Sequence, residues 1–441
     1  MANRKGSISV TVATAVGLGA IIGAGIFVLS GSAIALAGAD AIIAFILVGV
    51  IATFVALQIA ELGSIMPTAQ GASYSYVYNA FGSELGFITG VIFYFSSATA
   101  ISAISLGFGA YLASMLGIAS GYSVYLAVPL ILALSVLTLF GMKKAANADF
   151  LLVLIKMVVL SIFIIFAVYF AFGLGHFNIS NFGISNAQSG IEPIAAASIA
   201  IFFAYSGFQT ISTFTSDVKG GPRAAAKSIM LAVLLSLAVY VMIVISMMML
   251  VPSSTYKVST ADPISLALST ISAPYALEII VGIGALIATA SASLAMMLRS
   301  SRIVYQLGKD GLLPKFLRKY DAVKDVSPNG VFVTVIIAVA ALFAGNVYII
   351  AAISAFGTLF TYLMSSFALI HFRRIRKPGS FKSPLYPYIS IVSIIAILAF
   401  IYGMPQESLF IGIVLILVLI ITYYFMREYD EKKVVKIRIF K

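Results

Sequence analysis

Long apolar segments alternate with short polar ones along the whole chain. A helix needs about 20 apolar residues, within a range of about 17 to 25, to cross the hydrocarbon core of a bilayer. Twelve segments of the sequence meet this requirement, so we predict an all-α membrane protein with twelve transmembrane helices. The predicted spans are 9–37, 41–65, 84–115, 123–141, 147–173, 192–217, 224–251, 275–306, 329–345, 347–371, 384–404 and 408–426.

The composition agrees with this pattern. Hydrophobic residues make up 61% of the chain and charged residues 10%, with a mean hydropathy of +1.10. Soluble domains average about 45–50% apolar and about 25% charged residues, so lipid must be the solvent for much of this surface. Cysteine is absent, and the two histidines, His176 and His371, fall at the ends of predicted spans. We therefore predict no metal site and no disulfide.

Positive charge predicts the orientation. The net charge is +12, and every Lys and Arg except Lys156 and Lys257 falls near a terminus or in alternate connections. This assignment places Arg299 to Lys324 in one connection. Cytoplasmic connections carry the excess of Lys and Arg, so we predict a multi-pass plasma-membrane protein with both termini in the cytoplasm. The bilayer accounts for the positive surplus, and no nucleic-acid partner is predicted.

One predicted cytoplasmic connection has its own pattern. Residues 66–83 alternate Tyr with small side chains and contain neither Lys nor Arg. Such a segment is typical of a short amphipathic helix that lies on the membrane surface.

Glycines interrupt the first predicted span near its middle. Residues 17–28 read GLGAIIGAGIFV, with four glycines in nine positions. Each glycine in a helix costs about 1 kcal/mol relative to alanine, so the segment favours a break at Gly23-Ala24-Gly25. Close packing of helices across small residues is the alternative explanation.

A second candidate break, at Tyr205-Ser206-Gly207, lies in the sixth span. Five crossings separate the first span from the sixth, so a repeated five-helix unit would occur in opposite orientations. Interrupted helices at matching places in inverted halves point to the binding site of a secondary transporter. We predict a first repeat over 1–173, an inverted repeat over 174–371, and two further helices with a basic tail over 372–441.

Unpaired backbone groups at the two breaks predict the chemistry of the ligand. N–H groups at the start of a half-helix favour a carboxylate, and carbonyl groups at the end of a half-helix suit an ammonium. An α-amino acid carries both groups at a suitable separation. The predicted carboxylate donors are the N–H groups of Ala24, Gly25 and Ile26, and the predicted ammonium acceptors are the carbonyl groups of Ile21, Phe203 and Ser206.

A single lysine, Lys156, lies about ten residues into the fifth span, which corresponds to a depth of about 14 Å. An intramembrane lysine is costly and indicates a functional site, although a structural lysine bonded to carbonyl groups is the alternative. Gly19 lies at a similar depth in the first span. The eighth span offers three hydroxyl groups near its middle, those of Thr289, Ser291 and Ser293.

Four stretches of the sequence resemble the amino acid–polyamine–organocation superfamily, whose members have the LeuT-type five-plus-five inverted repeat. They are 17–28, 60–82, 202–227 and 301–316. The match is imperfect at three places: Gln70 stands where the family usually has a glycine, Asp217 replaces the usual glutamate, and the proline usual near position 225 is missing.

The resemblance implies amino-acid transport by alternating access. Phe203 aligns with the aromatic residue that closes over the substrate in this family, and Met296 is a candidate for the side-chain pocket. In sodium-coupled relatives, carbonyl groups of helix one and hydroxyl groups of helix eight hold a sodium ion. The resemblance implies that Lys156, with Gly19 and Ser291, takes that place, so the proton is the expected coupling ion and no sodium site or cofactor is expected.

Other polar residues are assigned supporting roles. Glu61 fits the family pattern, and we expect it to stabilise the inner gate or to pair with a basic loop. Arg302 is the suggested partner of Glu61 or of Asp217. Gln209 follows the second break and is expected to contact the substrate side chain. Because some relatives carry an acid at that position, its absence favours neutral amino acids over cationic ones.

Several alternatives remain at this point. An amino-acid exchanger on the same fold is the closest, and a sodium-coupled symporter, a polyamine transporter, a channel and a receptor are less favoured. A membrane enzyme would need a catalytic constellation, and the sequence offers no Cys and no paired acids near one face.

Overall fold

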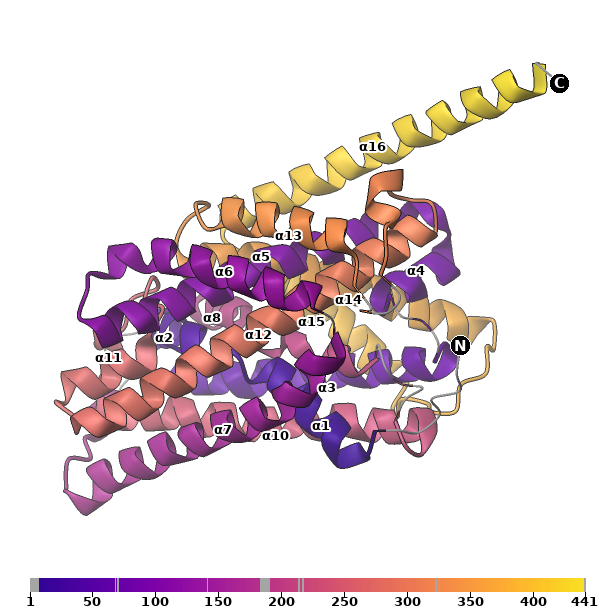
Figure 1. Cartoon of the computed structure of the whole chain (residues 1–441). Coiled ribbons are helices and arrows are strands. Elements are labelled where there is room, and N and C mark those ends of the chain that lie inside the picture. The colour runs from indigo at the N-terminus through magenta and orange to yellow at the C-terminus, as the bar shows by residue number, and fades with distance from the viewer. Residues whose placement is uncertain are drawn as a thin grey trace.

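The computed structural model of the protein is helical over nearly all of its described length (Figure 1). It describes residues 8–67, 69, 71–140, 142–182, 191–212, 215, 218–321, 324 and 326–439. Within these ranges, β-type pairing is limited to two isolated bridges, Ile8 with Val218 and Asp321 with Val326. The all-α prediction is confirmed.

Helices lie in each of the twelve predicted spans. Among the described residues, nine helical stretches are long and apolar enough to cross a membrane, and three apolar helices are shorter. The exact number of crossings, the inverted repeat and its boundaries at 173 and 371 stay predictions. The helices in the spans are α1 (Val10–Ile21) with α2 (Ala24–Ala37), α3 (Asp40–Ile65), α5 (Ser83–Leu116), α6 (Ser123–Leu139), α7 (Met142–Val168), α8 (Ile191–Tyr205) with α9 (Gln209–Ser212), α10 (Gly221–Leu250), α12 (Tyr275–Lys309), α13 (Pro328–Ala341), α14 (Val347–Arg374), α15 (Tyr388–Tyr402) and α16 (Gln406–Ile439).

Two short helices lie outside the spans. Helix α4 (Ser73–Phe81) occupies the segment for which the sequence predicts an amphipathic helix, and α11 (Pro263–Thr270) precedes α12. Local chemistry sets several helix ends. The side chain of Ser327 accepts a hydrogen bond from the N–H of Gly330 at the start of α13, and Asn346 caps α14 in the same way through Ile349.

Helix α5 lies at the centre of the bundle. It packs against α12, α14 and α6, while α10 packs against α3 and α1. Most of the side chains of α5 are buried, whereas α16 (yellow in Figure 1) runs along the outside of the bundle and projects beyond it. The core is therefore built around α5 and α12, and both of the interrupted helices pack within it.

The first break is a true interruption. Helix α1 ends at Ile21, Ile22 and Gly23 have non-helical backbone angles, and α2 starts at Ala24. The second interruption is milder than the unwound backbone that the sequence predicts. The α-helix changes to a 3₁₀ turn over Ser206–Phe208, and the chain then stays helical to Ser212. A 3₁₀ turn inside a helix shifts the hydrogen-bond pattern without fully unwinding the backbone.

The two interrupted helices cross at glycines. A Cβ on Gly25 would lie 2.2 Å from the Cα of Ala204, and a Cβ on Gly207 would lie 2.1 Å from the carbonyl oxygen of Ala20. A Cβ on Gly23 would lie 2.4 Å from the Cβ of Ala292 on α12. Both explanations of the glycine cluster, a helix break and close helix packing, therefore apply, because these residues permit the break and also the close approach of the backbones.

We expect Gly207→Ala to destabilise the protein by about 1–3 kcal/mol or more, because the added methyl group would push against backbone rather than a movable side chain. Gly121→Ala is the matched control, since a Cβ at Gly121 meets open space. The measurement is the thermal unfolding midpoint of the detergent-purified protein. Equal midpoints for the two variants would contradict the close crossing.

Candidate functional site

Tyr240 of α10 joins the two breaks. Its hydroxyl lies 2.7 Å from the carbonyl oxygen of Ile21, to which it donates, and 3.1 Å from that of Ala204. The ring is fully buried and contacts the rings of Phe45 and Tyr205 edge to face. Tyr240 was not among the predicted site residues, although a tyrosine in the middle of the apolar span 224–251 indicates a buried hydroxyl that needs a partner.

Two of the three predicted ammonium acceptors, the carbonyl groups of Ile21 and Ser206, already have donors. The carbonyl group of Ile21 accepts from Tyr240 and from the N–H of Gly23, at 2.9 Å, and that of Ser206 accepts from the hydroxyl of Tyr362 at 3.3 Å. A carbonyl oxygen has two lone pairs. A substrate ammonium could therefore join Tyr362 at Ser206 but would have to displace a donor at Ile21.

Helix α2 starts without a side-chain cap at the residues that the sequence proposes for a carboxylate, and binding of a carboxylate there stays a prediction. Gly23 occupies the cap position and no side chain caps this end. The first N–H groups of a helix have no acceptor within the helix, and here they belong to Ala24, Gly25 and Ile26. Ile26 is fully buried, so this helix start lies inside the protein, where a carboxylate would be held strongly.

Lys156 of α7 lies between α1 and α12. Its Nζ donates to the carbonyl oxygen of Gly19 at 3.1 Å and to the hydroxyl of Ser291 at 3.0 Å. The lysine is fully buried and Ser291 is almost so. The structure thus brings together the three residues that the sequence proposes for coupling, and it places the lysine on the carbonyl group two residues before the end of α1.

Phe203, Gln209 and Met296 are all buried. Phe203 lies in the last turn of α8, beside the 3₁₀ turn. The amide oxygen of Gln209 accepts from Ser73 of α4 at 3.4 Å, while its Nε2 has no partner among the described residues. Met296 lies one turn after Ala292, the residue that touches Gly23. Their predicted contacts with a substrate stay predictions.

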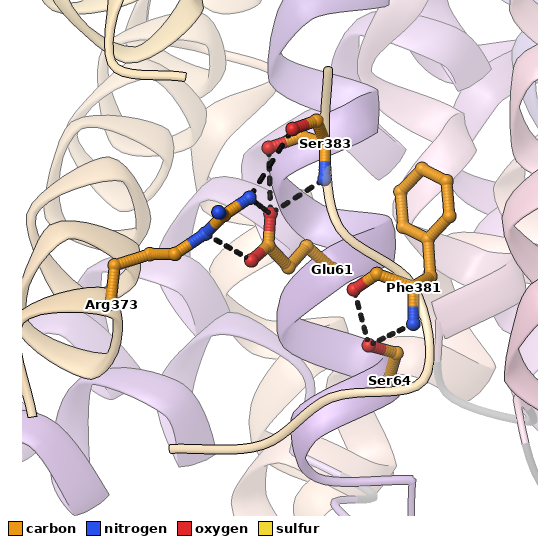
Figure 2. A network of polar contacts seen from close by, with 5 residues as sticks. All are labelled: Glu61, Ser64, Arg373, Phe381 and Ser383. Carbon is orange, nitrogen blue, oxygen red and sulfur yellow. Dashed lines mark hydrogen bonds and ion pairs between the residues drawn. The ribbon is translucent and has the colours of Figure 1, made fainter. Parts of the chain in front are cut away.

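Glu61 of α3 contacts the last turn of α14 and the connection that follows it, both distant from Glu61 in the sequence (Figure 2). Its carboxylate forms a two-armed ion pair with Arg373, at 2.5 and 2.8 Å, and accepts from the N–H and hydroxyl of Ser383 at 2.7 and 2.6 Å. Nearby, the hydroxyl of Ser64 bonds the backbone of Phe381. The pairing of Glu61 with a basic segment is as predicted.

Of the two acids suggested as partners of Arg302, Glu61 pairs with Arg373 instead. The pair joins α3 to the last turn of α14, and its two residues are too far apart in the sequence for a local pattern to predict it. Asp217, the other suggested partner of Arg302, lies outside the described residues. The role of Glu61 in gating stays a prediction.

Helix α4 is fixed to the end of α12. The hydroxyl of Tyr74 donates to the carboxylate of Asp310 at 2.7 Å, and Gln306 donates to the same carboxylate. Burial, followed by the hydrogen bond to Asp310, raises the pKa of Tyr74 far above its usual value. The tyrosine therefore remains a donor at any physiological pH and keeps α4 over this end of the bundle.

Two predictions disagree about Arg299: the predicted span 275–306 includes it, whereas the charge count places it in a cytoplasmic connection. The structure agrees with the span, because Arg299 is buried in α12 with its Nε donating to the hydroxyl of Ser97 at 3.0 Å. Helix α12 continues to Lys309, so the charge that marks the end of the apolar span lies three turns inside the helix.

Comparison with known proteins identifies the family. The family model described as amino acid permease matches residues 12–435. The chain belongs to the amino acid permease family. This permease is accordingly a multi-pass membrane transporter and not an enzyme.

Relatives of the permease cover nearly its whole length. A branched-chain amino acid permease of Lactococcus lactis is 28% identical over 429 residues, which are 90% of this chain and 90% of the relative. A methylthioribose transporter of Bacillus subtilis is 27% identical, over 89% of this chain and 87% of the relative. A manganese transporter of Eremococcus coleocola has a similar fold, with a TM-score of 0.63, 15% identity and 99% coverage of each chain.

We expect Tyr240→Phe to weaken amino-acid binding by this permease. The carbonyl group of Ile21 would lose its Tyr240 donor, at a cost of about 1–3 kcal/mol, and the geometry of the first break would relax. Tyr348→Phe is the matched control, because the Tyr348 hydroxyl bonds the carbonyl group of Ala196 at 3.2 Å, away from the breaks. A rise in the half-saturating concentration for uptake in Tyr240→Phe alone is expected, and equal effects of both variants would contradict this role.

Removal of Arg373 is expected to cost more stability than removal of Glu61. Glu61 is 2% exposed and the Arg373 side chain 22% exposed, so Arg373→Met strands a fully buried charge while Glu61→Gln strands a partly hydrated one. In a double-mutant cycle of thermal unfolding, the pair should show a coupling of about 1–3 kcal/mol. Arg374→Met, at an exposed neighbour, serves as the control, and additive effects would argue against the pair.

Proposed function

We propose that this permease imports neutral, hydrophobic amino acids by alternating access and uses the proton as its coupling ion. The observation that carries the proposal is Lys156, whose ammonium bonds the Gly19 carbonyl near the end of α1 and the Ser291 hydroxyl on α12. A titratable group thereby holds the helix whose end forms one half of the substrate site.

The substrate class rests on the breaks. Segments 17–28 and 202–212 contain no acidic residue, so nothing in them would balance a cationic side chain. Gly23 and Gly25 meet Ala292 and Ala204, and these apolar neighbours suit an aliphatic side chain. The relatedness to branched-chain amino acid permeases supports the same class.

The coupling follows from the burial of Lys156. A charged lysine in a low-dielectric interior is stable only with good hydrogen-bond partners, which here are the Gly19 carbonyl and the Ser291 hydroxyl. Charged, the lysine ties α1, α7 and α12 together. Neutral, it loses most of its attraction for the Gly19 carbonyl and allows α1 to move, which makes a two-state element that a proton biases.

The orientation is part of the proposal. The excess of Lys and Arg near the termini and in alternate connections supports a cytoplasmic location for both ends in the plasma membrane. The proton would then enter with the amino acid from the outer side.

The test is uptake of labelled leucine into proteoliposomes with an imposed pH gradient. We expect the wild-type chain to accumulate leucine above its external concentration, and Lys156→Met to equilibrate leucine without accumulation. Methionine fills the space of the lysine without its charge. The control is Lys257→Met, which removes an exposed lysine from the segment before α11.

Three results would contradict the proposal. Undiminished accumulation by Lys156→Met would remove the lysine from the coupling mechanism. Uptake that follows a sodium gradient and ignores pH would assign coupling to another ion. Uptake of methylthioribose in place of any amino acid would assign the substrate of another relative to this chain.

A further inference from the structure

Arg299 lies on α12 between the breaks and one end of the bundle. Ala292, seven residues earlier on the same helix, touches Gly23 at the first break. At 1.5 Å per residue, Arg299 is about 10 Å further along the helix axis, toward its C-terminal end. The charge distribution assigns this side to the cytoplasm. Arg299 therefore lies two turns from the first break, on the side that the proposed orientation assigns to the cytoplasm.

The guanidinium of Arg299 is buried, with 7% of the residue exposed. Its Nε donates to the Ser97 hydroxyl at 3.0 Å, and its Cζ lies 4.9 Å from the ring centre of Phe93. Its Nη1 is buried and has no hydrogen-bond partner. No carboxylate among the described residues pairs with it. Its partners are one hydroxyl and one aromatic face, so the buried cation lacks a counter-ion and an acceptor for Nη1.

Such a residue is expensive for a fold. A buried charge without a counter-ion costs several kcal/mol, and a methionine of similar volume would avoid this cost. Unsatisfied buried donors are rare in folded proteins, and they point to a missing partner. Charged side chains inside membrane proteins lie on substrate or ion paths by default. The missing partner of Arg299 must be an acceptor, and a negative charge suits it best.

A tyrosine of α14 and a second unmatched donor lie at the second break. The hydroxyl of Tyr362 on α14 donates to the Ser206 carbonyl at 3.3 Å. The Tyr362 ring also stacks on Phe208, with ring centres 5.2 Å apart. Gln209, the next residue, carries a second buried donor without a partner, its Nε2.

We propose that Arg299 is a carboxylate site on the cytoplasmic side of the substrate site. It takes the α-carboxylate of the amino acid after that group leaves the start of α2 and before the molecule reaches the cytoplasm. The guanidinium offers a planar fork that matches the two oxygens of a carboxylate. This inference rests on the proposed function for the identity of the carboxylate. A positive side chain on the substrate would be repelled at the same point, which agrees with neutral substrates.

The first test separates a ligand site from a structural arginine. Arg299→Met should leave the thermal unfolding midpoint of the ligand-free protein unchanged or raise it, because it removes an unmatched buried charge. Arg374→Met, at an exposed arginine at the end of α14, is the control. A midpoint for Arg299→Met well below that of the control would show that the arginine holds the fold together and would overturn the proposal.

The second test measures binding beside Arg299. The chain contains no tryptophan, so Phe93→Trp places a single fluorescent reporter under the guanidinium. In detergent at constant ionic strength, 4-methylpentanoate, which is leucine without its amino group, should give a saturable fluorescence change. The same change should be at least about tenfold weaker in Phe93→Trp/Arg299→Gln and partly restored by Arg299→Lys. 3-Methylbutylamine, which lacks the carboxylate, should give no change.

Two results would overturn the assignment. One is an equal fluorescence change in the Arg299→Gln background. The other is a fluorescence change with chloride as large as that with 4-methylpentanoate, which would show that the site binds a small inorganic anion. Calorimetric titration of the unsubstituted chain and of Arg299→Gln with the same two probes gives the answer without the reporter. Since neither measurement involves transport, loss of pH-driven uptake elsewhere does not change these results, and failure here leaves the proposed function in place.

Discussion

The first helix ends inside the bundle, and the structure depends on hydrogen-bond donors for the carbonyl groups of Gly19 and Ile21 at that end. Lipid offers these groups no donors, so the protein must supply them. Tyr240 donates to Ile21 from α10, and Lys156 donates to Gly19 from α7. The interrupted helix persists because two other helices each bring one donor to its end.

The same arrangement places the residue proposed for coupling next to the segment proposed for binding. The carbonyl groups of Gly19 and Ile21 lie on one helix end, and the uncapped start of α2 follows after two residues. In the proposed mechanism, a change in the protonation of Lys156 would act on the segment that positions the first N–H groups of α2. Gly207 and Gly25 keep the second interrupted helix in direct backbone contact with the first, so a shift of one helix end would be passed to the other.

The sequence predicted what depends on hydrophobic length and on strong local signals. It located the spans, the first break and the depth of Lys156 relative to Gly19 and Ser291. It failed where tertiary contacts decide. Arg299 falls within the predicted span 275–306, but the charge count assigned it to a connection, and no sequence pattern indicates that Ser97 and Phe93 accommodate its side chain inside the bundle. Glu61 and Arg373 are 312 positions apart, and no local pattern pairs them. Tyr240 was overlooked because a single hydroxyl has no periodicity.

The central claim is that the two breaks form one site for a zwitterion, and competition for labelled leucine uptake in proteoliposomes tests it most directly. The competitors are unlabelled leucine, 4-methylpentanoate, which lacks the amino group, and 3-methylbutylamine, which lacks the carboxylate. The account predicts that leucine competes and that each half-molecule is at least about tenfold weaker, since each forgoes one set of charge-assisted hydrogen bonds. Competition by either half-molecule that equals that of leucine would contradict a site built from both helix ends.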